Sequence, residues 1–66
     1  MQTYTLAIIL KHYLLTDYGI SVYGDKRKET FVNDFAHDWL MDNPQPEIAA
    51  ATFRCACLLQ RETILA

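Results

Sequence analysis

The sequence lacks the features that identify most enzymes and metal proteins. It has only two glycines, two prolines and two cysteines among 66 residues. It contains no glycine-rich phosphate loop, no CxxC pair and no HxxxH pair, and no nucleophile is accompanied by a base and an orienting acid. We therefore expect a protein that is not an enzyme, with no catalytic residue, no metal site and no cofactor.

Long apolar runs and an excess of basic charge are also missing. The apolar run 6–10 is far shorter than the ~20 residues of a membrane span, and no basic segment precedes it as in a signal peptide. We expect no membrane contact and a cytoplasmic location with reduced thiols. The net charge of −2 and the pI of about 5.4 disfavour a general role in binding nucleic-acid phosphates.

What the sequence does contain is a globular composition in a very short chain. Hydrophobic residues make up 52% of the chain and charged residues 21%. Such a chain folds, but a domain of this size buries only about 60% of the surface that its unfolded form exposes. Without disulfides or a metal, it gains stability mainly from regular helix packing or from oligomerisation. We expect one helical domain over residues 1–66.

The spacing of apolar residues favours helices throughout. It predicts helices near residues 3–18, 25–42 and 46–64. Gly19 is expected to end the first helix, and Asp25 to cap the second. Asn43 precedes a proline and stops the second helix, and Pro46 is expected as the first residue of the third.

The third segment is apolar on nearly all sides, so it is expected to be packed from more than one side, which two other short helices cannot easily provide. The predicted fold is therefore an all-α, compact three-helix domain with the C-terminal helix central. One face of the first helix is predicted to comprise Leu6, Ile9, Leu10, Tyr13 and Leu14. Phe35 and Trp39 of the second helix are expected at the centre of the core, facing Leu10, Leu14, Cys55 and Leu59.

Cys55 and Cys57 are predicted to have different surroundings. On a helix, two residues apart corresponds to about 200° of rotation, so the side chains diverge and cannot form a disulfide with each other. Cys55 falls on the core face. Cys57 falls on a second apolar strip together with Phe53 and Ile64.

Further surplus apolar residues occur on the first helix, where Ile8 and Leu15 lie opposite the core face. Contiguous exposed apolar patches mark interaction sites. We expect a homodimer in which these five residues, the self-association residues, take part: Phe53, Cys57, Ile64, Ile8 and Leu15. The alternative is a monomer in which the loop 20–24 folds over the strip on the third helix.

Charge is arranged unusually on the second helix. Asp34, Asp38 and Asp42 follow one another at a spacing of four residues, with His37 beside them, and we call this group the acidic ridge. Acids near the end of a helix oppose its dipole. The acidic ridge is predicted to bind a protein partner with a basic surface, although an ordinary solvated surface is the alternative.

These patterns favour a small protein–protein interaction module that acts as a regulator or inhibitor. Its size and acidity resemble those of small helical proteins that phages and plasmids encode to block host machinery, including machinery that handles nucleic acid. The alternative is a dimeric regulator associated with nucleic acid. Its contacts would come from Lys26, Arg27, Lys28, Arg54 and Arg61.

Overall fold

Three helices account for most of the chain. They are α1 (Thr3–Tyr18), α2 (Lys26–Asp42) and α3 (Ile48–Leu65). The computed structural model describes residues 1–65, with side chains as far as residue 61, and this range contains no strand. The prediction of a compact all-α, three-helix domain is confirmed.

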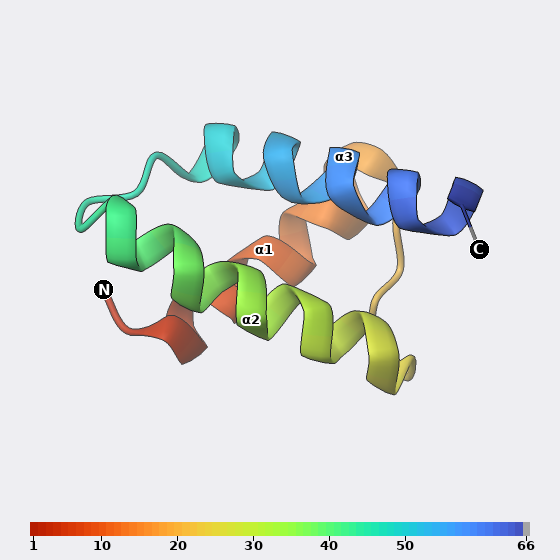
Figure 1. Ribbon diagram of the computed structural model, residues 1–66, viewed down its shortest axis with the longest axis horizontal. Coiled ribbons are helices and arrows are strands. Elements are labelled where there is room, and N and C mark those ends of the chain that lie inside the picture. The colour runs from red at the N-terminus through yellow and green to blue at the C-terminus, as the bar shows by residue number, and fades with distance from the viewer. Residues whose placement is uncertain (66) are drawn as a thin grey trace.

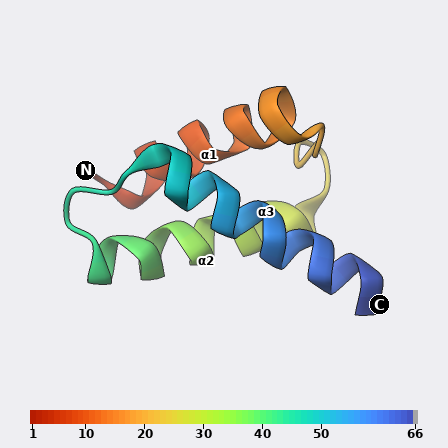
Figure 2. The ribbon, with the colours of Figure 1, turned by 90° about the horizontal axis from the view of Figure 1, so that it is seen from above.

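The helices form a pair with a third helix laid across it. α1 and α2 run in opposite directions, and α3 crosses over both of them (Figures 1 and 2). All three pairs of helices are in contact, most extensively α1 with α2 and least extensively α2 with α3. The central position of the C-terminal helix stays a prediction.

The first two helices begin and end where the sequence indicates. Gly19 has a positive φ of 66°, and its N–H donates to the carbonyl of Leu15 at 3.1 Å, which closes α1. A side chain would be strained in this left-handed conformation, so glycine is required here. At the start of α2, the carboxylate of Asp25 accepts a hydrogen bond from the backbone N–H of Lys28 at 3.1 Å. This is the expected N-cap.

The start of α3 differs from the prediction by two residues. The helix begins at Ile48 and not at Pro46. Its first turn is closed by the N–H of Ala51, which donates to the carbonyl of Glu47 at 3.0 Å. Pro46 therefore lies just before the helix. The proline ring fixes φ near −65°, which is compatible with a linker residue close to a helix start as well as with the first helical position.

The core is built from aliphatic side chains of all three helices and of one loop. Its buried members are Leu6, Ala7, Leu10, Leu14, Val22, Val32, Ala36, Ala51, Cys55, Ala56 and Leu59. Val22 belongs to the loop between α1 and α2. Its side chain is completely buried, so the loop packs against the core at this residue.

The expected placement of the large aromatic side chains was wrong. Val32 and Ala36 are the fully buried residues of α2, whereas Phe35 and Trp39 are half-buried at the edge of the core. The two rings stack on each other beside these smaller buried side chains, with centroids 5.5 Å apart. Tyr13 of α1 is likewise 40% exposed and not on the core face.

Candidate functional site

The acidic ridge lies on the outer side of α2. Asp34, Asp38 and Asp42 are all exposed. The Nδ1 atom of His37 lies 3.5 Å from Oδ1 of Asp38, and both side chains are mostly in solvent. Within the described part of the chain, no lysine or arginine forms an ion pair with these three aspartates. The ridge is therefore a surface whose negative charge no lysine or arginine of the described residues neutralises.

An exposed methionine interrupts this negative surface. Met41 is 72% exposed. It follows Asp38 by three residues and Asp34 by seven, so it shares their side of the helix. A flexible thioether among carboxylates gives the outer side of α2 both apolar area and charge. This combination is suited to contact with another protein.

The two cysteines of α3 differ as predicted. Cys55 is buried, and desolvation raises the pKa of its thiol to about 12. Cys57 is exposed, and Phe53, one turn earlier, is 58% exposed. Ile64, the third residue assigned to this strip, lies outside the residues whose side chains the structure describes.

The loop between α1 and α2 does not cover this strip. The alternative of a monomer with a covered strip required Phe53 and Cys57 to be shielded, and both are exposed. Instead, the loop turns Val22 into the core, and half-buried Ile20 packs against it. The described residues of the α3 strip, Phe53 and Cys57, are therefore open to solvent.

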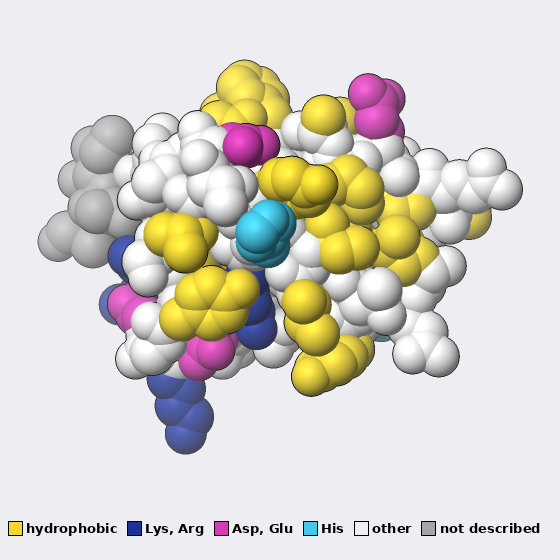
Figure 3. Space-filling view, turned by 180° about the vertical axis from the view of Figure 1, so that it is seen from behind, with side chains coloured by type: hydrophobic (Ala, Val, Ile, Leu, Met, Phe, Trp, Pro, Cys, Tyr) yellow, Lys and Arg dark blue, Asp and Glu magenta, His cyan; other side chains and the backbone are white. Residues whose placement is uncertain are grey.

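The outer side of α1 carries several large apolar side chains, with exposed His12 between Ile8 and Leu15. Ile8 and Leu15 are 45% and 43% exposed, and Tyr4 on the same side is 74% exposed. Figure 3, which views the molecule from behind, shows hydrophobic side chains gathered over the face that α1 presents. The side chain of Asp17 lies beside residues of α3. Leu15 is about 200° of helical rotation from Asp17, so it points away from α3. The apolar patch on α1 and the α3 strip are therefore separate surfaces. Their role in self-association stays a prediction.

Only some of the predicted basic residues lie near one another. Lys26 and Arg27 are exposed at the start of α2, with Lys28 half-buried beside them, and Arg61 is near the end of α3. These helix ends lie at the same end of the molecule (Figure 1). Arg54 is about two helical turns away from Arg61.

Acidic residues flank the basic residues at the start of α2. Asp25 directly precedes the three basic residues of α2, and Glu29 directly follows them. Glu29 also lies 3.9 Å from the ammonium of Lys11, so part of its charge is paired across the two helices. The start of α2 therefore carries both positive and negative charges.

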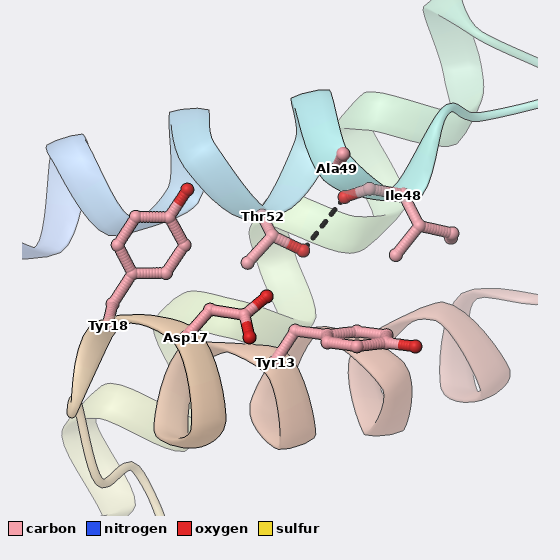
Figure 4. A pocket seen from close by; sticks show the side chains of 6 residues that line it. All are labelled: Tyr13, Asp17, Tyr18, Ile48, Ala49 and Thr52. Atoms are coloured by element: carbon pink, nitrogen blue, oxygen red, sulfur yellow. Dashed lines mark hydrogen bonds between the residues drawn. The ribbon is translucent and has the colours of Figure 1, made fainter.

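A groove between α1 and α3 was not predicted from the sequence. It has a volume of about 300 Å³ and is lined by Tyr13, Asp17, Tyr18, Ile48, Ala49 and Thr52. Figure 4 shows the carboxylate of Asp17 between the two tyrosine side chains, directed toward α3. The spacing of Tyr13 and Asp17, four residues apart, indicated a shared side of the helix. That α3 lies beside it depends on the packing of the helices.

Two other kinds of site are not found in the described residues. No three histidine, cysteine, aspartate or glutamate side chains come together there as a metal site would require. None of the helices, over the residues described, is long and apolar enough to cross a membrane.

Comparison with protein-family models, with curated proteins and with solved structures finds no match to this chain. A function must therefore be inferred from the surfaces of the molecule itself.

Proposed function

We propose that this protein is a small non-enzymatic interaction module, a regulator or inhibitor that docks the acidic ridge of α2 on a larger protein with a basic surface. The observation that carries the proposal is the set of three exposed aspartates without an ion pair to lysine or arginine in the described part of the chain. Machinery that handles nucleic acid offers basic surfaces of this kind.

The energetics of α2 support the proposal. Each pair of like charges four residues apart costs about 0.2–0.5 kcal/mol, and Asp34, Asp38 and Asp42 form two such pairs. Asp42 is also the last residue of the helix, where the dipole disfavours an acid. A basic partner would relieve these repulsions, so binding would gain from charges that the isolated molecule holds at a cost.

Exchange of a single charge tests the proposal. Asp38→Lys reverses the central charge of the ridge, and Glu47→Lys changes the net charge equally at an exposed position outside it. Both tagged variants would be used for affinity capture from extracts of the organism that encodes the chain, with quantitative mass spectrometry against the unmodified protein. We expect partners captured by the parent to be lost with Asp38→Lys and retained with Glu47→Lys. Equal retention by both variants would reject the ridge as the docking site.

A second candidate is a dimeric regulator associated with nucleic acid. It is favoured because the start of α2 and the end of α3 lie at the same end of the molecule (Figure 1). The first carries Lys26, Arg27 and Lys28, and Arg61 is near the second. Binding of this kind weakens steeply as salt concentration rises, because bound counterions are released from the phosphates. Retention on immobilised DNA at low salt, lost in an Arg27→Ala/Arg61→Ala variant, would favour this candidate over the acidic docking surface.

A further inference from the structure

The groove between α1 and α3 is lined by a carboxylate but by no basic side chain. Its lining includes one carboxylate, two phenol rings and a threonine, with Ile48 and Ala49 as apolar walls. The hydroxyl of Thr52 donates to the carbonyl of Ile48 at 2.8 Å, so its oxygen is left to accept. The lining contains no lysine, arginine, histidine or amide side chain. The phenol hydroxyls can donate as well as accept, but the only charged group of the lining is the carboxylate of Asp17. A negative charge beside aromatic faces suits a cation that carries several N–H donors.

Asp17 has little to compensate its charge. Its carboxylate accepts a hydrogen bond from Oγ1 of Thr16 at 3.3 Å, and no basic side chain of the described residues pairs with it. It lies in the last turn of α1, where the negative end of the helix dipole repels an acid and where no basic residue occurs. An acid held there between two tyrosines is complementary to a positive charge from outside.

We propose that this groove binds an arginine side chain of the partner protein. The guanidinium would donate to the carboxylate of Asp17 and stack on Tyr13 or Tyr18, while its aliphatic stem lies along Ile48 and Ala49. Arginine fits better than lysine, because a planar group stacks on a ring and donates two parallel hydrogen bonds to a carboxylate. The volume of about 300 Å³ is at the small end of ligand pockets, as suits one side chain.

Phe53 extends this site beyond the groove. It follows Ala49 by one helical turn and is 58% exposed, so the apolar strip of α3 begins at the rim of the groove. An arginine at the centre of a contact, bordered by aromatic side chains, is a common arrangement of the residues that contribute most to protein–protein affinity.

This inference deepens the proposed function and rests on it, since a partner with a basic surface supplies the arginine. The two sites are nevertheless separate, because no residue of α2 lines the groove. Capture of a partner through the acidic ridge can therefore succeed even if the groove binds no arginine. Likewise, the groove can bind arginine even if the ridge captures no partner.

The test uses short peptides and the isotope-labelled protein. Acetyl-Gly-Arg-Gly-amide would be titrated while backbone amide resonances are followed by NMR, and the same peptide with citrulline, a neutral isostere of arginine, is the control. We expect the arginine peptide to shift the resonances of Tyr13, Asp17 and Ala49. The citrulline peptide should bind at least tenfold more weakly.

Two matched variants complete the test. Asp17→Asn should weaken binding of the arginine peptide at least tenfold, whereas Asp38→Asn, with the same change of charge on the acidic ridge, should leave it unchanged. Thermal unfolding of Asp17→Asn checks the fold, and its midpoint should equal or exceed that of the parent, because the acid is unfavourable at this helix end.

Four results would overturn the proposal. They are equal binding of both peptides, resonance shifts confined to α2, equal weakening by the two variants, or resonances of Tyr13 and Asp17 that change with protein concentration in the absence of peptide. The last result would assign the groove to a second copy of the chain.

Discussion

Cys55 and Cys57 differ in reactivity because their surroundings differ. The thiolate is the reactive form, and burial of Cys55 raises its pKa to about 12, whereas Cys57 is exposed. We expect a thiol reagent at pH 8 to modify one thiol of the folded protein quickly and the second only after denaturant is added. Mass spectrometry of the labelled peptides should identify the fast thiol as Cys57. Rapid labelling of Cys55 in the folded protein would contradict its burial.

The same burial predicts a loss of stability at alkaline pH. The thiol of Cys55 has a pKa of about 12 when folded against 9.0 as its ordinary value. Between these two pH values the unfolded chain releases a proton that the folded chain retains, so the free energy of unfolding falls as pH rises. The limiting slope is about 1.4 kcal/mol per pH unit. Urea unfolding at pH 8 and pH 10 should show this loss, and Cys55→Ala should reduce it.

Trp39 combines apolar packing with an unsatisfied donor. Its indole N–H is buried without a hydrogen-bond partner among the described residues, although the ring stacks on Phe35. A buried donor without a partner costs about 1–3 kcal/mol. We expect Trp39→Phe to stay within about 1 kcal/mol of the parent, because the lost area is offset by removal of this donor. Trp39→Ala should cost about 3 kcal/mol, because it leaves a cavity.

Chemical unfolding of both variants, followed by circular dichroism, measures these differences. A Trp39→Phe variant destabilised as strongly as Trp39→Ala would show that the indole N–H has a partner. An unchanged Trp39→Ala variant would show that the ring contributes no packing.

At the scale of the element, α2 carries its charges in an unfavourable order. Asp38 has a like charge four residues before it and four residues after it. Asp38→Lys converts both repulsive pairs into attractive ones and places a base near the end of the helix. We expect the free energy of unfolding to rise by about 1 kcal/mol, from pairs of about 0.2–0.5 kcal/mol each and the dipole.

Thermal unfolding at low and high salt checks this origin, because screening should shrink the gain at high salt. The same variant is the one expected to lose its partner. A gain in stability together with a loss of binding is a result that damage to the fold cannot produce. If Asp38→Lys were less stable than the parent, the charges of the ridge would have internal partners.

The helices themselves were predictable because their signals are local. Apolar spacing together with Gly19, Asp25 and Asn43 located α1 and α2 to within one residue. The start of α3 was placed too early at Pro46, because a proline suits a linker residue close to a helix start as well as the first helical position. The separate environments of Cys55 and Cys57 also followed from helical rotation alone.

Features that depend on how helices cross could not be read from single segments. Helical spacing placed Phe35, Ala36 and Trp39 on one stripe, but it did not show that the small residue would lie innermost and the rings at the edge. The groove required Asp17 of α1 to face Thr52 of α3, which are far apart in sequence. The residue types that line the groove are visible in the sequence, but the sequence does not show that they come together.

At the scale of the whole molecule, apolar surface is left over after folding. Exposed large side chains remain on α1 and α3, including Tyr4, Ile8 and Phe53. The molecule exposes 4571 Å² in all. A stable interface covers roughly 800 Å² per partner. The surface is therefore large enough for self-association and for a separate contact with a partner protein.

The expected dimer is centred on the open strip of α3. In a two-fold dimer each patch meets itself, and a residue near the axis approaches its own copy. Cys57 and Phe53 share this strip, one helical turn apart. We therefore expect sedimentation at micromolar concentration to show a dimer, and mild oxidation to link two chains through Cys57. Cys57→Ser should prevent this link, since buried Cys55 cannot replace it.

Charged substitutions locate the interface. Phe53→Asp introduces a carboxylate into the α3 strip, so a dimer formed there should dissociate, because burying a charge without a partner is costly. Ile8→Asp is the matched change on the separate patch of α1, and a dimer centred on α3 should survive it. Dissociation by Ile8→Asp alone would move the interface to α1. A strict monomer without cross-linking would leave both apolar patches to the partner protein, with Phe53 as the rim of the arginine site.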